Sequence, residues 1–445
     1  MPSSLTAPEE GGRSLPTTLP DLRRGASLLV LLLRPEAWVS RRVESVSYSP
    51  EGLVRRAVSV DFQPLGQDPE ILPIPSRGED AATILVPLAL LSKAPLALLD
   101  VRDEAGVAMP VLGTENNGFL AYSALSALAT QVLPEVSDGA LSAPVLRSLH
   151  QVALAPSELA VSVVEGMASS ENAQLRALSA DPAFFKLASD LARNFVLLAE
   201  VHSDPARIAA RRILKFAYVT TPLRGRRSFL DWLWLPNERT VSLDVPSIGD
   251  AQSYHFQFCP PSSVHVRDCS MDVDDPFEGV KSLPGLVVGG TGHLHAMREA
   301  PGSSGVAKVT VVATHQGAVA SSLVCGGLNT VVILAFTAWA CTTLPTSEPD
   351  PGGAWQALFL AIPALAGAFL ANPGELGLLS RLLAGARAAL LLSAVVTMMV
   401  ALGLAVGVAG DTLKQTLVAA SVVSAACCTR LVQWFVRCRR VGTER

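Results

Sequence analysis

Four histidines in the second half of the chain are the residues whose type and spacing come closest to a chemical site. His293 and His295 lie two residues apart in GHLHAM, so they point to one face if this segment is a strand. Neutral imidazole is a common ligand of zinc, and a zinc site needs at least three protein ligands. His255 and His265 would complete a metal site only if their strands lie beside that of His293 and His295. The alternative is a half-buried strand whose imidazoles bond to their neighbours.

Other reactive residue types lack a pattern that chemistry requires. Cys259 follows His255 by four residues, which permits a catalytic thiol or a buried, inert one. The acidic stretch DVDDPFEG (272–279) departs from a calcium-binding loop because the required glycine is absent and Pro276 intervenes. No G-x-S-x-G, H-E-x-x-H or C-x-x-C motif occurs. The sequence therefore identifies no catalytic residue and no cofactor-binding residue, which favours a protein without enzymatic activity.

The segments that carry the histidines alternate between apolar and polar residues. QSYHFQF, SSVHVRDCSM, GHLHAM and VAKVTVVATH read as short strands, separated by clusters of Pro, Gly and Asp. Such strands and turns are typical of a β-sandwich or a small barrel. We therefore expect residues 223–316 to form an all-β, sandwich-like domain.

An α+β domain is expected over residues 22–222, after a disordered tail at residues 1–21. Residues 38–62 and 96–112 each have the pattern of a β-hairpin with a turn signal between its arms. Thr114 is expected to cap a helix, and residues 142–202 are helical in character, with breaks near Pro156 and Pro182. A strand is expected again near residues 211–220.

The C-terminal third is expected to lie in a membrane. Hydrophobic residues make up 49% of the chain and charged residues 17%, and no Lys, Arg, Asp or Glu occurs between Lys308 and Glu348. Soluble domains carry about 25% charged residues. Residues 317–436 are thus predicted to form a four-helix transmembrane bundle, with Arg430 leaving the full span of the last helix open. The expected spans are 318–344, 354–371, 388–410 and 415–436.

The basic residues near the spans predict an orientation. The connection 345–353 has two acids and no basic residue, whereas Arg381, Arg387 and the basic tail at 437–445 lie at the other side. By the positive-inside rule that side is cytoplasmic. With four spans and no signal peptide, the N-terminal domains and the C-terminus are both expected in the cytoplasm.

Two segments resemble a known group of proteins. SYHFQFCPP (253–261) and AIPALAGAFLANPGELGLLSRLLAGAR (361–387) are similar to segments of uncharacterised multi-pass membrane proteins of actinobacteria. In those proteins an aromatic-histidine strand precedes a proline turn, and a proline-bearing span ends in a Pro-Gly-Glu turn. The likeness covers residues 206–390. It implies the architecture described above and assigns no reaction.

The expected function is that of an integral membrane protein with cytoplasmic domains for binding, assembly or sensing. A channel or transporter subunit and a membrane-tethered enzyme are the alternatives. The expected partners are the lipid bilayer and a protein partner or a second copy of the chain. The formal net charge of −4 argues against a nucleic-acid partner. Paired arginines on the predicted strands either face anionic lipid or lie on ordinary solvated strand faces; they are Arg41–Arg42, Arg55–Arg56, and Arg224 with Arg226–Arg227.

Overall fold

The structure is a computed structural model, and it describes most of the chain. The described residues are 19–48, 53–63, 73–75, 83–94, 97–133, 141–202, 211–220, 238–246, 248–275, 279–297, 299, 303–314, 317–343, 357–362, 365–366, 382–406 and 410–443. The expected tail at residues 1–18 therefore lies outside the described residues, and so does most of the predicted span 354–371. Residues 19–21, expected in the tail, begin the first helix.

The chain divides into two compact units that interleave along the sequence. The first unit comprises residues 1–38, 62–95 and 101–214, and the second comprises residues 39–61, 96–100 and 215–445. The sequence analysis expected one uninterrupted domain over 22–222. The structure instead assigns the first predicted hairpin to the second unit, because its first strand pairs with a strand more than two hundred residues later.

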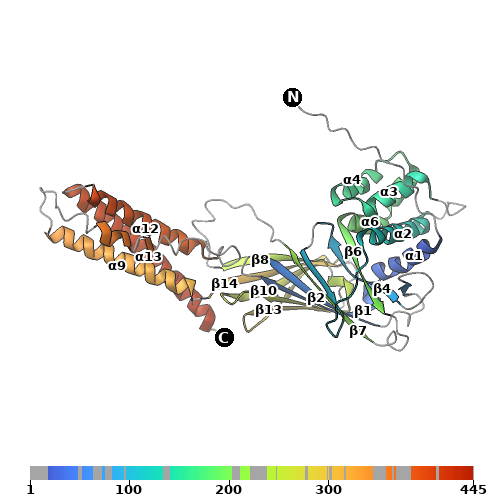
Figure 1. Ribbon diagram of the computed structural model, residues 1–445, viewed down its shortest axis with the longest axis horizontal. Coiled ribbons are helices and arrows are strands. Elements are labelled where there is room, and N and C mark those ends of the chain that lie inside the picture. The colour runs from blue at the N-terminus through green and yellow to red at the C-terminus, as the bar shows by residue number, and fades with distance from the viewer. Residues whose placement is uncertain are drawn as a thin grey trace, which may run out of the picture. The chain divides into compact units, whose positions relative to one another are not determined.

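The first unit is built from helices and a small sheet (Figure 1). Its sheet has the order β3-β4-β6, and the expected breaks near Pro156 and Pro182 are confirmed by the starts of α4 and α6. The helices are α1 (Leu19–Leu33), α2 (Thr114–Val132), α3 (Ala143–Leu154), α4 (Ser157–Met167), α5 (Ala173–Ala180) and α6 (Pro182–Arg193), and the strands are β3 (Ile74–Pro75), β4 (Thr83–Ser92) and β6 (Asn194–His202).

Local chemistry explains where several of these helices begin. The Asn172 side chain accepts hydrogen bonds from the backbone N–H groups of Gln174 and Leu175, and so caps α5. The Asp181 carboxylate does the same for Phe184 at the start of α6. The prediction that Thr114 caps α2 is wrong by one residue, since Gly113 occupies the cap position and makes no side-chain bond there.

The end of the expected helical region is also corrected. Residues 194–202 form strand β6 rather than a helix, and β6 pairs antiparallel with β4. The sequence NFVLLAEVH is apolar over a short run, and periodicity alone does not separate a buried strand from a buried helix segment in such runs. Val196, Leu198 and Ala199 are fully buried, as the sheet pairing requires.

Among the described residues of the second unit, the strands form two sheets. One sheet has the order β12-β13-β9-β1-β2-β7-β5, and the other has the order β11-β10-β14-β8. The first comprises β12 (Leu286–Val288), β13 (Thr291–Met297), β9 (Ser253–Cys259), β1 (Val39–Tyr48), β2 (Val54–Phe62), β7 (Arg212–Thr220) and β5 (Ala97–Arg102), and the second comprises β11 (Gly279–Pro284), β10 (Val264–Asp275), β14 (Ser304–Ala313) and β8 (Glu238–Val245).

Strict alternation gives the seven-stranded sheet two chemically different faces. On β9, Tyr254, Phe256 and Phe258 are at most 1% exposed and join one buried cluster with residues of both sheets. Ser253, His255 and Gln257 point to the opposite side, which we call the outer face. The inner face therefore supplies the core, and the outer face is free to carry polar side chains.

A parallel pairing joins the N-terminal hairpin to the later strands. In the register of β1 with β9, Arg42 lies opposite Tyr254, Val43 opposite His255, and Ser45 opposite Gln257. Parallel neighbours need a long connection between them, and the intervening residues of the first unit provide it. The hairpin predicted over 38–62 is confirmed as β1 and β2, although its place in the second unit was not foreseen.

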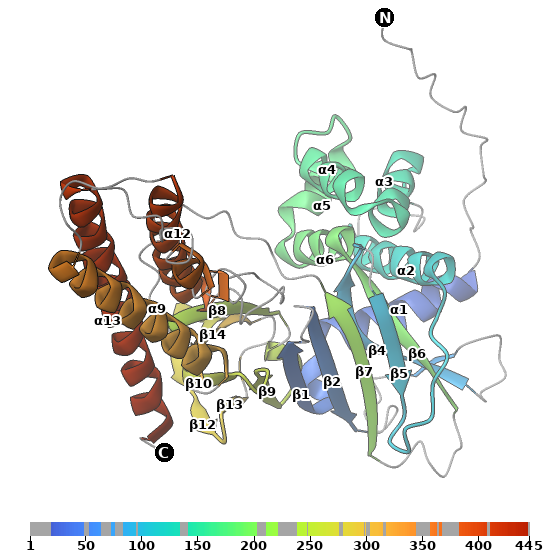
Figure 2. The same cartoon turned by 60° about the vertical axis from the view of Figure 1, so that its left-hand side comes forward.

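Three long apolar helices follow the sheets, and they lie side by side in both overall views (Figures 1 and 2). They are α9 (Ala318–Thr343), α12 (Ala384–Ala405) and α13 (Asp411–Thr443). Each is long and apolar enough to cross a membrane, by length and composition. The last helix runs without a break through Arg430 and continues to Thr443, where a separate basic tail was expected from residue 437.

Side-chain contacts fix the directions of these helices. Asn329 of α9 bonds to Ser393 and Thr397 of α12, and Thr330 bonds to Ser424 of α13. About two turns further along α9, Thr337 bonds to Ser421, which precedes Ser424 in α13. Helix α13 is therefore antiparallel to α9. Helix α12 is parallel to α9, because the start of each lies near Leu431 in α13 and the ends of both cluster with Leu413.

We predict opposite effects for two glycine-to-alanine substitutions in the first unit. Gly25→Ala in α1 places a Cβ 2.4 Å from the carbonyl carbon of Ser123 in α2. The helices then have to separate, and the free energy of unfolding should fall by about 1–3 kcal/mol. Thermal unfolding of the full chain in detergent, followed by circular dichroism, measures the change.

Gly166→Ala in α4 is the matched control, because nothing lies within 4 Å of its added Cβ. Alanine should stabilise the helix there by up to about 1 kcal/mol. Equal stability of the two variants would contradict the close approach of α1 and α2.

Candidate functional site

His255 and His295 form a stacked pair on the outer face, hereafter the histidine pair. They lie directly opposite one another on the antiparallel strands β9 and β13. Their ring centroids are 4.2 Å apart, and the ring planes differ by 16°. Cross-strand neighbours come this close because residues directly opposite have Cβ atoms about 4.5–5.5 Å apart.

Ser253 links the two rings. Its Oγ lies 3.1 Å from Nε2 of His255 and 3.2 Å from Nε2 of His295. A hydroxyl carries one proton and accepts two further hydrogen bonds. When both rings are neutral, one ring donates its Nε2–H to Oγ and the hydroxyl donates to Nε2 of the other ring. In this neutral state, one proton on Nε2 of one ring and one proton on Oγ thus make both hydrogen bonds among Ser253, His255 and His295.

Positive charge surrounds the histidine pair. Partial burial lowers the pKa of the His255 imidazole, and the charges of His295 and Arg41 lower it further. Arg41 precedes Arg42, which lies opposite Tyr254, so Arg41 occupies the level of Ser253 on the neighbouring strand β1. Its side chain is exposed on the outer face. The site is therefore electropositive whenever either ring takes up a proton.

The structure separates the four histidines named as metal-ligand candidates. It brings His255 and His295 together, and it places His293 on the same face of β13, opposite Gln257. His265 lies in β10 of the other sheet, opposite Val312. Within the described part of the chain, no group of three or more His, Cys, Asp or Glu is arranged to hold a metal ion. A metal site at these positions stays a prediction.

Cys259, the candidate thiol, does not meet the histidine pair. It ends β9, opposite Ser47 of β1, four residues beyond His255 along the same strand. Burial raises the pKa of the Cys259 thiol, which keeps it protonated and weakly nucleophilic. A thiol held in this state is a poor candidate for covalent catalysis.

Sequence reasoning missed two members of the site, Ser253 and Arg41. Ser253 precedes His255 by two residues, so period-two alternation in QSYHFQF was a usable signal. Arg41 is brought to the site only by the parallel pairing of β1 with β9. No local pattern in the sequence predicts that pairing.

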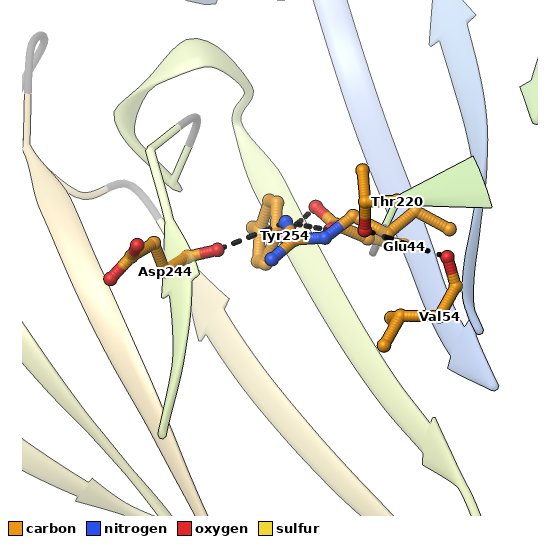
Figure 3. Close-up of polar contacts among 6 residues, drawn as sticks. Glu44, Val54, Thr220, Asp244 and Tyr254 are labelled. Atoms are coloured by element: carbon orange, nitrogen blue, oxygen red, sulfur yellow. Dashed lines mark hydrogen bonds and ion pairs between the residues drawn. The ribbon is translucent and has the colours of Figure 1, made fainter. Parts of the chain in front are cut away.

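A second cluster, the carboxylate clamp, lies on the inner face of the same sheet and consists of Glu44, Arg56 and Tyr254. Nη1 of Arg56 donates to Oε1 of Glu44 at 2.8 Å, and the Tyr254 hydroxyl donates to Oε2 at 2.7 Å. Figure 3 shows Glu44 and Tyr254 side by side, with Asp244 on a strand of the other sheet. The Glu44 side chain is 4% exposed and that of Arg56 is 15% exposed. Each carboxylate oxygen of Glu44 thus receives a hydrogen bond in a nearly dry environment.

The carboxylate clamp also joins the two sheets. The same Nη1 atom of Arg56 donates to the backbone carbonyl of Asp244 in β8, at 3.0 Å. Burial opposes the charge on Arg56, but Glu44 and other neighbours outweigh it, so the pKa of Arg56 is raised. Burial and the charge of Glu44 raise the pKa of the Tyr254 phenol well above its ordinary value. Arg56 therefore keeps its charge and Tyr254 its proton across the physiological range, as a structural clamp requires.

The paired arginines divide between the two faces. Arg42 and Arg56 point inward, and the Arg42 guanidinium lies 5.9 Å from the centroid of the Phe216 ring. Arg41 and Arg55 point outward and are exposed. The sequence analysis treated each pair as a whole, facing either anionic lipid or solvent. Neither description fits both members of a pair, because adjacent residues in a strand face opposite sides. Arg224, Arg226 and Arg227 lie outside the described residues.

Lys93 in the first unit has a perturbed pKa for structural reasons. Burial lowers the pKa of its ammonium group to about 8. Its Nζ donates to the backbone carbonyls of Val152, Ala153 and Ala155, at 2.9, 3.1 and 3.1 Å. These carbonyls stand at the C-terminus of α3, where helices leave acceptors without partners. The three donors of Lys93 are thereby used to cap a helix.

Comparison with known proteins leaves the family open. Neither the family models nor the curated proteins that were searched match this chain. The likeness of residues 206–390 to actinobacterial membrane proteins therefore stays a prediction. Function has to be argued from the geometry of the chain itself.

We predict that the carboxylate clamp makes Arg56 far more sensitive to substitution than its neighbour Arg55. Arg56→Met leaves Glu44 buried without its cation, and the free energy of unfolding should fall by about 3–5 kcal/mol. Arg55→Met removes the same charge from the exposed outer face, where changes stay within about 0.5 kcal/mol. Chemical denaturation of the full chain in detergent measures both.

The double variant Glu44→Gln, Arg56→Met has the same side chain at position 56 as the single variant, but it lacks the buried charge at position 44. It therefore separates the loss of the ion pair from the change in side-chain packing. Removal of the buried charge should recover at least about 1 kcal/mol relative to Arg56→Met. Equal losses in the single and double variants would show that packing, and not the ion pair, explains the effect.

Proposed function

We propose that this chain is an integral membrane protein whose soluble parts serve binding, assembly or sensing, without catalysis. The observation that carries the proposal is the set of three long apolar helices, joined by neutral side chains. The sandwich-like arrangement of the two sheets, and their place in the cytoplasm, belong to the same proposal.

The contacts among the helices favour an anchor over an ion pathway. Asn329 donates to Ser393 Oγ at 2.6 Å and to Thr397 Oγ1 at 3.0 Å, and Thr330 pairs with Ser424 at 3.0 Å. Such contacts hold transmembrane helices together by about 0.6–2 kcal/mol each. Proton and ion pathways instead use ionisable residues inside the membrane, and α9 carries none over Ala318–Thr343.

The directions of the helices support four spans. Helices α9 and α12 are parallel, so the chain leaves α9 at one end of the bundle and enters α12 at the other. Residues 357–362 of the predicted span 354–371 are helical, and Leu360 packs in one cluster with Ile333 of α9, Val400 of α12 and Leu417 of α13. An even number of spans places the N-terminal parts and the C-terminus on the same side of the membrane.

The positions of the arginines support a cytoplasmic orientation. Arg387 lies in the first turn of α12, and Arg430, Arg437 and Arg439 lie in the last part of α13. Because α13 is antiparallel to the other two helices, these residues gather at the end where α9 begins. The positive-inside rule assigns that end to the cytoplasm, together with the residues that precede α9.

We predict that tags at residue 1 and residue 445 are both protected in right-side-out vesicles, whereas a tag inserted at 345–353 is accessible. Protease protection and impermeant labelling measure the accessibility. Three spans would place the two termini on opposite sides, and the inverse orientation would expose both. Either result contradicts the proposed topology.

We also predict that purified chain in liposomes conducts no measurable flux of Na⁺, K⁺ or protons. A flux-competent channel of known conductance serves as the control for vesicle integrity. Flux that disappears in the Asn329→Leu variant would favour the channel or transporter alternative. A tethered enzyme would be favoured by a cluster of His255, Cys259, His293 and His295, but Cys259 lies opposite Ser47 and His293 opposite Gln257, away from the Ser253 hydroxyl that the histidine pair shares.

A further inference from the structure

We propose that the histidine pair, with Ser253 and Arg41, binds an oxyanion of the sulfate or phosphate type on the outer face. The inference does not depend on the membrane anchor. It rests on four donor groups that share one small area of the sheet and on the sign of the charges around them.

The geometry places anion donors together. Ser253 Oγ lies within 3.2 Å of Nε2 in each ring, so both rings direct an Nε2 toward one point. Protonated imidazoles carry N–H donors at both nitrogens, and the hydroxyl of Ser253 is then released to donate outward. The two Nε2–H groups then donate to Oγ, and an oxyanion accepts from the Ser253 hydroxyl and from Arg41 beside two imidazolium charges. Charge-assisted bonds such as that of Arg41 are about twice as strong as neutral ones.

The charges favour an anion over a cation. The two neighbouring groups whose charges lower the pKa of His255 are both basic, His295 in β13 and Arg41 in β1. The other titratable side chain on this face of β13 is His293, opposite the neutral Gln257. The neighbouring positions on the outer face of β1 carry Val43 and Ser45, which are uncharged. Among the described neighbours on these strands, no acidic side chain compensates the cationic groups, and an anionic ligand would do so.

The small number of ligands argues against a metal ion at the same place. Zinc needs at least three protein ligands. Among the described residues, no third His, Cys, Asp or Glu joins the two imidazoles in a group arranged to hold a metal ion. An arginine beside the site adds repulsion toward any cation.

Protonation links anion binding to pH. Two imidazolium ions 4.2 Å apart repel each other, and a bound anion screens this repulsion. Binding therefore raises the pKa of His255 from its lowered value, and affinity falls as pH rises through that pKa. Sulfate is the better probe because it stays a dianion over this range, whereas phosphate changes its own charge.

The test uses the full chain in detergent with ¹³C-labelled histidine, followed by NMR. Sulfate is titrated at pH 5.5 and pH 8 against sodium chloride of equal ionic strength. At pH 5.5 the signals of His255 and His295 should shift with saturation, and affinity should be at least about tenfold weaker at pH 8. Arg41→Gln and His295→Gln should each weaken binding by about tenfold or more.

The matched controls are Arg55→Gln and His293→Gln, which remove the same residue types from the same outer face. Both should retain the affinity within about twofold, as expected for charges that make no direct contact. Ser253→Ala provides a smaller change that leaves both rings in place and should also weaken binding. Affinity that is independent of pH, or equal losses in the control and site variants, would overturn the proposal.

Two further titrations distinguish the sources of the anion. Inorganic phosphate represents a soluble ligand, and short-chain phosphatidic acid below its micelle concentration represents a lipid headgroup. Shifts of the same two histidine signals with either probe support the site and identify its source. Shifts with Zn²⁺ but with neither anion would contradict it.

Discussion

A single guanidinium nitrogen bonds to both sheets of the second unit. Nη1 of Arg56 bonds to Glu44 within its own sheet and to the backbone of Asp244 in the other sheet. A buried carboxylate is stable only when its charge is compensated and its oxygens are hydrogen-bonded. Arg56 meets the first requirement and Tyr254 completes the second. These bonds link β1, β2, β8 and β9, beside the buried apolar cluster that the two sheets share.

The same strands that form the carboxylate clamp also carry the candidate binding site. Tyr254 and His255 are adjacent in β9, yet one is fully buried and the other faces outward beside His295. A rigid inner face therefore fixes the backbone from which the histidine pair projects. Preorganised donors bind better than flexible ones, because less conformational freedom is lost on binding. The fold thus places the buried Tyr254 phenol, whose pKa is raised, and the His255 imidazole, whose pKa is lowered, on opposite faces of one strand.

How much of the structure could be predicted from the sequence depended on how far apart in the chain the interacting residues lie. Alternation predicted the strands that became β8, β9, β10, β13 and β14, and it predicted that His293 and His295 share a face. Composition predicted the apolar helices, and their directions along the bundle came only from side-chain contacts such as that of Asn329 with Ser393. The pairing of β1 with β9 was not predictable, because strand propensity and turn chemistry are local properties. Arg41 and Glu44 owe their contacts with β9 to that pairing. The sequence pattern therefore named Arg41 only as one of a pair of arginines and did not single out Glu44.

The parallel pairing also means that β1 is synthesised well before its partner strand β9. Ser45 and its partner Gln257 are 212 residues apart. At about 5–20 residues per second, β1 leaves the ribosome roughly 10–40 s before β9 exists. During that interval the side of β1 that will bind β9 is an unpaired strand edge, which invites association with other nascent chains. Translation speed and the supply of holding chaperones should therefore govern the yield of this protein more strongly than its final stability does.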